Sequence, residues 1–287
     1  MSTLIDGLSL GSIYALIALG YTMVYGIAKM LNFAHGDIIM VGAYAVMSTI
    51  GLCGSPAAAV AAAIVICTGL GIITERVAYR PLRGASPLAV LITAIGVSYL
   101  LQSIAQLVYG AESQPVSLGN PGHVSLGGLT VNVSTLITLF AGAVIMGVLS
   151  IFIKKTKIGR AMIAVSEDRG AAELMGINVN LIITLTFAIG SALAACASVF
   201  YLMQIPAVSP TLGSMPGIKA FTAAVIGGIG SIPGAMIGGV LLGVIEKLSL
   251  SVPAISPYTT SIEFGLLILI LLVKPTGLLG RRRREKV

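Results

Sequence analysis

The sequence predicts an all-α protein, a polytopic helical bundle that crosses a lipid bilayer many times. Of its 287 residues, 56% are hydrophobic and only 9% are charged, with a mean hydropathy of +1.03. Soluble domains carry about 25% charged residues. Several uncharged runs approach or exceed the roughly 20 residues that a helix needs to cross a hydrocarbon core, where unpaired backbone groups are not tolerated. We therefore expect one transmembrane domain over residues 1–287.

Uncharged apolar runs mark the expected spans in order along the chain. They cover 8–28, 38–53, 57–74, 87–109, 133–153 and 181–205, of which 38–53 is the shortest. A further run, 220–245, is interrupted by glycines and Pro233, and a last span ends at Val273. The interrupted run either crosses twice, turning near "GGIGSIPGA", or does not cross at all.

Basic residues set the expected topology. They cluster at 76–83, 154–169 and 274–286, whereas 110–132 has Glu112 and no Lys or Arg. The positive-inside rule places the three clusters in the cytoplasm and 110–132 outside. An even number of crossings must then separate the second and third clusters, so the interrupted run is expected to cross twice. The count is about nine spans, with eight as the alternative, the N-terminus outside and the tail 274–287 in the cytoplasm.

Two glycine-interrupted segments, 25–44 and 226–243, are expected to line a transport route. Interrupted membrane helices expose backbone groups and helix ends toward a cavity. The pathway candidates are Asn32, His35, Asp37, Gly228, Gly230 and Gly234. For the glycines the alternative is close helix packing through small residues, and a lone histidine in a polar turn is more often structural than a ligand.

The chain has no pattern typical of catalysis, of a metal site or of a cofactor. His35 and His123 lie far apart, the three cysteines are isolated, and "GGIGSIPGA" lacks the lysine of a phosphate-binding loop. Glu246 and Glu263 are either intramembrane functional charges or, for Glu246 beside Lys247, an interface pair. The net charge is +7, and much of it lies in the basic stretch "RRRREK", which follows the last apolar span. That position favours contact with lipid headgroups over nucleic-acid binding.

The loop 154–180 carries the signals of a short capped helix on the cytoplasmic side. Ser166 is a candidate N-cap, Glu167 and Asp168 suit the first turn, and Gly176 supplies a C-terminal stop. Such a helix would project from the inner face of the membrane. On these signals alone, a solvated connector remains the alternative.

Six stretches together resemble, in order and over nearly the whole chain, the LivH-type permease of high-affinity branched-chain amino acid ABC importers. They are "GSIYALIALGYTMVYGI", "NFAHGD", "ERVAYRPLR", "IGRAMIAVSED", "GAAELMGIN" and "KAFTAAVIGGIGSIPGAMIGG". The fifth resembles a degenerate form of the EAA-type loop that docks permeases onto ATPases, with Gly170 and Ala171 where Glu and Ala are usual.

The resemblance implies a membrane subunit without enzyme activity in the cell inner membrane. It implies a second related permease, two cytoplasmic ABC ATPases and an extracytoplasmic substrate-binding protein as partners. The matching positions for ATPase coupling are Ser166, Glu167, Asp168, Ala171, Ala172, Glu173, Met175 and Gly176. The alternatives are a urea or short-amide permease of the same superfamily and a self-contained secondary carrier, which would need membrane-embedded acids for ion coupling.

Overall fold

The structure is a computed structural model that describes residues 2–116, 118–119, 122–126 and 129–280. The described chain is helical apart from two small antiparallel two-stranded sheets. The long helices are α1 (Ser2–Ala28), α2 (His35–Cys53), α3 (Pro56–Thr74), α4 (Pro87–Tyr109), α5 (Val133–Lys155), α8 (Val179–Gln204), α10 (Ile232–Ser251) and α11 (Thr259–Val273). The shorter ones are α6 (Lys157–Glu167), α7 (Arg169–Leu174) and α9 (Ser214–Gly227), with a π segment at Glu75–Tyr79 and 3-10 turns at Arg80–Leu82 and Ser256–Tyr258.

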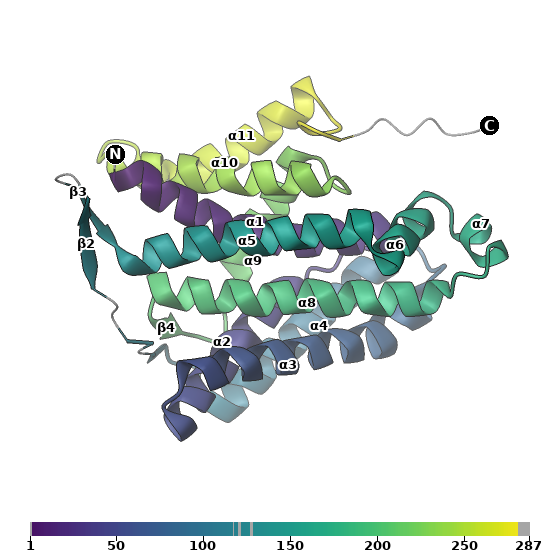
Figure 1. Ribbon diagram of the computed structural model, residues 1–287, viewed down its shortest axis with the longest axis horizontal. Coiled ribbons are helices and arrows are strands. Elements are labelled where there is room, and N and C mark those ends of the chain that lie inside the picture. Colours follow the sequence, from purple (N-terminus) through teal and green to yellow (C-terminus); the bar gives the residue numbers. More distant parts are fainter. Residues whose placement is uncertain (1, 117, 120–121, 127–128, 281–287) are drawn as a thin grey trace.

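The strands are short and join loops at one end of the bundle. Strand β1 (Gln114–Pro115) pairs with β4 (Ala207–Val208), and β2 (His123–Leu126) pairs with β3 (Leu129–Asn132) in register His123 to Asn132. Figure 1 shows β2 and β3 at one end of the bundle and α6 and α7 at the other. We call these the strand end and the loop end.

Eight helical segments of the described chain are long and apolar enough to cross a membrane. The expected turn in "GGIGSIPGA" is present, because α9 ends at Gly227 and α10 begins at Ile232. However, α9 has only 14 residues, whereas a full crossing needs about 20. The structure therefore supports the lower of the two expected span counts, with α9 as a partial span.

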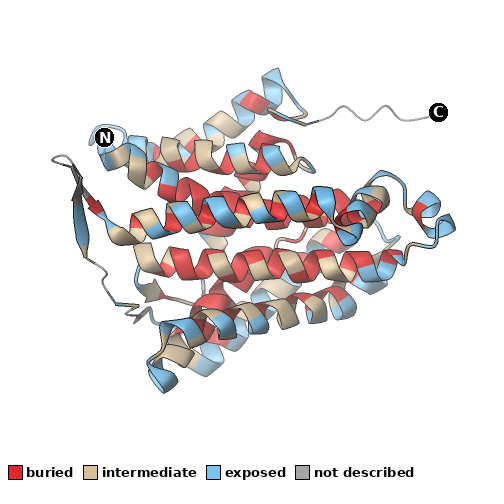
Figure 2. Cartoon of the chain, viewed as in Figure 1, coloured by how far each residue is buried: buried red, intermediate tan, exposed pale blue. Residues whose placement is uncertain are grey.

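Helix α1 forms the centre of the bundle, with 94% of its most apolar window buried, against 11% for the last span (Figure 2). It packs antiparallel on α10 through small residues. A Cβ on Gly11 would lie 2.7 Å from the Cα of Val240, and one on Gly7 would lie 3.0 Å from the Cα of Val244. Such backbone contact is how membrane helices associate in the absence of a hydrophobic driving force between them.

Helices α2 and α9 both begin inside the bundle rather than at its ends. His35, the first residue of α2, lies against Gly20, roughly two helical turns before α1 ends. The start of α9 meets it there, since a Cβ on Gly217 would lie 2.9 Å from the Cα of Gly36. The segments 29–34 and 205–213 therefore enter the bundle from its two ends and deliver two helix N-termini to one level.

The basic residues gather at the loop end. Arg83 donates to Asn180 beside the start of α8, and Arg169 donates to carbonyls at the end of α1. Lys154 and Lys155 occupy the last turn of α5. The expected grouping of the first two basic clusters on one side is thus present in the fold, whereas 281–287 of the third cluster lie outside the described residues.

Candidate functional site: a polar cavity between two helix starts

A cavity of about 420 Å³ lies where α2 and α9 begin. Its walls come from α1, α2, α4 and α9 and from the short segments that precede α2 and α9. Its polar lining includes Asp37, Ser98, Gln102 and Ser214. Its volume falls within the roughly 300–1,000 Å³ typical of small-molecule sites.

Asp37 is the ionisable group of this cavity. Its side chain sits in the first turn of α2, where the helix dipole favours negative charge, and the residue is only 2% exposed. The Gln102 amide nitrogen donates to the Asp37 carboxylate at 2.9 Å and lies 3.3 Å from the Ser98 hydroxyl and 3.4 Å from the Ser214 hydroxyl. Charged residues inside membrane proteins are rare, and those that occur commonly face a cavity or a water-filled route.

The cavity presents three kinds of surface. The Asp37 carboxylate is an acceptor for a cation, and the N-termini of α2 and α9 provide positive potential for an anionic group. Apolar side chains complete the wall: Phe33, Leu91, Ile95 and Ile218. A small molecule that carries an ammonium, a carboxylate and an apolar side chain matches all three.

His35 does not line this cavity. It is 1% exposed and packs between Gly20 and the ring of Tyr21, with ring centroids 4.8 Å apart. Its Nε2 atom has no hydrogen-bond partner among the described residues. The placement favours the structural alternative, whereas a pathway role for His35 stays a prediction.

Asn32 lies on the loop-end side of an aromatic cluster. Its Oδ1 accepts a hydrogen bond from the Tyr79 hydroxyl at 2.7 Å, and the residue is buried. Tyr21 lines both the Asp37 cavity and the small recess beside Asn32, and Phe221 stacks edge-on to Tyr21 at 5.9 Å. The aromatic rings thus lie between Asp37 and Asn32.

Of the three glycine candidates, Gly228 and Gly230 occupy the turn between α9 and α10 and Gly234 lies in the first turn of α10, away from Asp37. Gly228 and Gly230 have φ values of +106° and +91°, which other residues rarely adopt. The Gly234 N–H donates to the Ser231 hydroxyl, the N-cap of α10, at 3.2 Å, and Gly234 packs against the backbone of Gly227. The structure shows close packing here, and a role for these glycines in the route stays a prediction.

The expected short helix of the loop 154–180 is present, with different boundaries. Helix α6 continues through Ser166 and Glu167, and the Ser166 hydroxyl donates to the Ile163 carbonyl. Asp168 is the N-cap instead, accepting the Ala171 N–H at 3.0 Å. Helix α6 was not predicted, because the expected cap pattern begins at Ser166 and the amphipathic run of α6 lies before it.

Of the residues expected to couple this loop to an ATPase, Ala172 is not at the surface. Ala172 is 3% exposed, so it packs inside the loop, whereas Leu174 is 90% exposed and Met175 is 81% exposed. Gly176 ends the helix with a φ of +81°, as predicted. The other coupling candidates, Glu167, Asp168, Ala171 and Glu173, are exposed.

Two features of the interior were not predicted. Ser98 and Gln102 stand one helical turn apart in an apolar run, and that spacing was the signal for a polar face on α4. Lys219 bridges Glu246 at 2.7 Å and Glu263 at 3.2 Å, so Glu246 is not paired with Lys247 as one alternative held. The Tyr14 hydroxyl completes this cluster by donating to Glu246 at 2.7 Å.

A bundle of apolar helices with a polar cavity where two helices begin inside it is typical of a multi-pass membrane permease, and the comparisons with known proteins agree. The model of the family described as "Branched-chain amino acid transport system / permease component" matches residues 3–272. The chain belongs to this family.

Two curated relatives match this chain over nearly all of their own length. The chain is 46% identical to the branched-chain amino acid permease protein BraD of Pseudomonas aeruginosa, over 100% of this chain and 98% of the relative. It is 45% identical to LivH of Escherichia coli K12, over 100% and 97%. Among solved structures, PsaBC from Streptococcus pneumoniae in complex with Fab matches with a TM-score of 0.52 and 16% identity, covering 96% of this chain and 93% of that one. That likeness concerns the fold alone.

Proposed function

We propose that this chain is the permease subunit of an ATP-driven importer and that it moves branched-chain amino acids across the cell inner membrane. One observation carries the proposal: a buried carboxylate, Asp37, faces a cavity at the N-termini of α2 and α9. A zwitterion with an apolar side chain fits this arrangement. The names of the relatives favour the same substrate class.

In this proposal the ammonium group binds Asp37, and the carboxylate faces the two helix N-termini. Charge-assisted hydrogen bonds of this kind are about twice as strong as neutral ones. The branched side chain packs on Ile95, Leu91 and Ile218. A partial span such as α9 supports such a site because the positive end of its helix dipole lies inside the bundle.

The loop end is assigned to the cytoplasm, because the basic residues gather there. The N-terminus then lies outside and the C-terminus inside. ATPases dock on the loop 154–180, a second related permease completes the membrane core, and a binding protein delivers the substrate at the strand end. Leu174 and Met175 support the docking site, since exposed apolar side chains outside the membrane mark contact surfaces.

The substitution Asp37→Asn tests the substrate site. The complete transporter is reconstituted in proteoliposomes with its binding protein and ATP, and uptake of radiolabelled leucine is measured. We expect Asp37→Asn to lower uptake about tenfold or more, because an amide loses the charge-assisted bond to the ammonium. The variant Asp37→Glu keeps the charge and retains more uptake.

The control is Glu112→Gln, which removes an exposed carboxylate from the 110–132 loop. Unchanged leucine uptake in Asp37→Asn, with normal assembly on size exclusion, contradicts the assignment. Uptake of urea but not leucine by the native protein would favour the short-amide alternative.

A further inference from the structure

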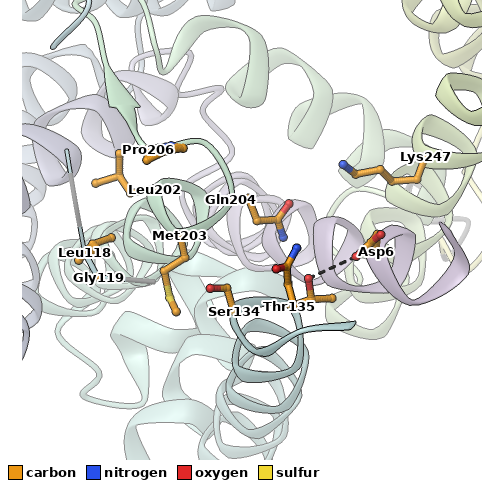
Figure 3. Close-up of a pocket in the computed structure, with 11 residues that line it drawn as sticks. Asp6, Leu118, Gly119, Ser134, Thr135, Leu202, Met203, Gln204, Pro206 and Lys247 are labelled. Atoms are coloured by element: carbon orange, nitrogen blue, oxygen red, sulfur yellow. Dashed lines mark hydrogen bonds between the residues drawn. The ribbon is translucent and has the colours of Figure 1, made fainter. Parts of the chain in front are cut away.

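A second cavity, of about 430 Å³, opens at the strand end of the bundle. Residues from α1, α5, α8 and α10 line it together with the loop residues 118–119, the end of β3 and Pro206, which precedes β4 (Figure 3). It shares no lining residue with the Asp37 cavity, which lies at the level where α2 and α9 begin. The chain therefore has two separate recesses along the bundle.

This strand-end cavity holds one carboxylate and one ammonium. Asp6 comes from the first turns of α1, and Lys247 comes from the last turns of α10. Among the described residues no ion pair joins them, since each of the three ion pairs in that part of the chain involves other residues. Two opposite charges thus face one recess without neutralising each other.

Hydrogen bonds hold the polar wall in place. The Thr135 hydroxyl donates to the Asp6 carboxylate at 3.3 Å, and Thr135 is itself only 5% exposed. The Gln204 amide donates to the Ser9 hydroxyl at 2.9 Å. The bond from Thr135 orients Asp6 and leaves carboxylate acceptor sites for a further donor, while the bond to Ser9 orients the Gln204 amide.

The opposite wall is apolar. In Figure 3, Asp6 and Lys247 lie on one side of the cavity, while Leu118, Leu202 and Pro206 lie on the other. Leu202 is 1% exposed, so this wall belongs to the packed bundle. The recess therefore separates a charged part, with both signs, from an apolar part.

We infer that the strand-end cavity is a binding site for a free zwitterionic amino acid with an apolar side chain. Asp6 binds the ammonium, Lys247 binds the carboxylate, and the accessible apolar side chains of Leu118, Met203 and Pro206 receive the side chain. The site holds the substrate after release from the binding protein and before it reaches Asp37. This inference rests on the proposed function and adds to it an outer site that the Asp37 cavity does not provide.

Photolabelling tests the site directly. The permease–ATPase complex in lipid nanodiscs, without binding protein, is irradiated with a leucine analogue that carries a diazirine in its side chain, and labelled peptides are mapped by mass spectrometry. We expect label on the peptide that contains Leu202 and Met203, where the apolar wall meets the side chain. Excess leucine should remove it.

Single-charge competitors then identify the two charged partners. We expect 4-methylpentanoate, which lacks the ammonium, and isopentylamine, which lacks the carboxylate, each to compete about tenfold or more weakly than leucine. In Asp6→Asn the advantage of leucine over 4-methylpentanoate should disappear, while its advantage over isopentylamine should remain. Lys247→Gln should show the reverse pattern. A merely structural role of either residue cannot produce this crossed result.

Conservative and distant variants serve as controls. Asp6→Glu and Lys247→Arg should keep both advantages, and Glu112→Gln should change nothing. Label near Asp37 and normal uptake, with none at Leu202, would overturn the outer site and leave the proposed function intact. A second outcome also overturns the outer site: no label at the Leu202 peptide, together with loss of binding-protein-stimulated ATP hydrolysis in both charge variants. In that case the cavity contacts the binding protein and not a free amino acid. Loss of uptake and of all label in the native complex would overturn both proposals.

Discussion

Single charged residues show most clearly how this chain tolerates polarity inside a membrane. Lys219 contacts two carboxylates and is 8% exposed, and one of its partners, Glu263, is fully buried. One oxygen of Glu263 has no hydrogen-bond partner among the described residues. The cluster ties α9 to α10 and α11, so it fixes the partial span whose N-terminus lines the Asp37 cavity.

Replacing the cation of this cluster should be strongly destabilising. Lys219→Met leaves the buried Glu263 and the half-buried Glu246 without a cation, and breaking a buried ion pair costs about 3–5 kcal/mol. We expect a clear fall in the midpoint of thermal unfolding of the purified protein in detergent. The matched control is Lys155→Met, because Lys155 is exposed.

A triple variant separates charge from packing in the same cluster. Adding Glu246→Gln and Glu263→Gln to Lys219→Met removes the uncompensated carboxylates, so most of the lost stability should return. If the triple variant is as unstable as the single one, packing of the lysine side chain and not its charge stabilises α9.

How far the sequence predicts the fold depends on whether an element is specified locally. Apolar runs predicted the long helices closely, since a span is determined by its own composition. The partial span α9 was harder to predict as a separate helix, because only the short turn 228–231 separates its 14 residues from α10. Its N-terminal depth depends on Gly36 of α2, a contact between distant segments that no local pattern contains.

The candidate site was predicted only in part for the same reason. Asp37 was identified because it interrupts an apolar stretch near a glycine. Gln102 and Ser214 approach it from α4 and α9, and only the tertiary structure brings them together. Likewise, adjacency in sequence suggested Glu246 with Lys247, whereas helix packing selects Lys219.

At the scale of elements, the contact between α1 and α10 should be intolerant of even one methyl group. In Gly11→Ala the new Cβ would lie 2.7 Å from the Cα of Val240, and backbone on both sides must shift. Overpacking of this kind costs about 1–3 kcal/mol. Thermal unfolding in detergent measures the loss.

The control for this substitution is Gly265→Ala on α11, where an added Cβ has no atom within 4 Å. It should be neutral or slightly stabilising, because alanine is the better helix former. Equal stability of both variants would mean that α1 and α10 do not depend on close approach.

The α7 loop is the second element with a specific prediction. Leu174→Asp together with Met175→Asp changes two exposed apolar side chains and should abolish copurification of the ATPases while leaving the thermal stability of the permease unchanged. Ala172→Asp, in contrast, should unfold the loop itself, since Ala172 is buried. Lys155→Gln is the control, and retained ATPases in the double variant would contradict docking through this surface.

At the scale of the whole molecule, one side chain joins the loop end to the centre of the bundle. Arg169, which begins α7, donates to the carbonyl of Ile27 at 3.3 Å and to that of Ala28. A cation at a helix C-terminus is favourable there. Burial, with Arg83 as the second cause, lowers the pKa of the Arg169 guanidinium, which nonetheless stays charged at neutral pH.

The path from this contact to the proposed substrate site is short. Ala28 ends α1, and the segment 29–34 then enters the bundle to begin α2 beside Asp37. If the loop 154–180 docks onto an ATPase as proposed, its displacement would act on α1 through the Arg169 contacts and on the cavity through the segment 29–34. In the proposed function, this arrangement would let ATP hydrolysis by an ATPase docked at the loop end change access to Asp37.

The substitution Arg169→Gln should uncouple the two events. We expect ATPases to copurify and to hydrolyse ATP, while the amount of leucine imported per ATP falls at least about fivefold, the lower range of coupling free energies between sites. Arg169→Lys keeps the cation and should retain part of the coupling, and Arg160→Gln, at an exposed position of α6, should behave as the native protein. The measurement is the ratio of leucine uptake to phosphate release in the same proteoliposomes. A normal ratio in Arg169→Gln would show that the loop moves the bundle by another contact, and a loss of ATPase binding would place Arg169 in the docking surface instead.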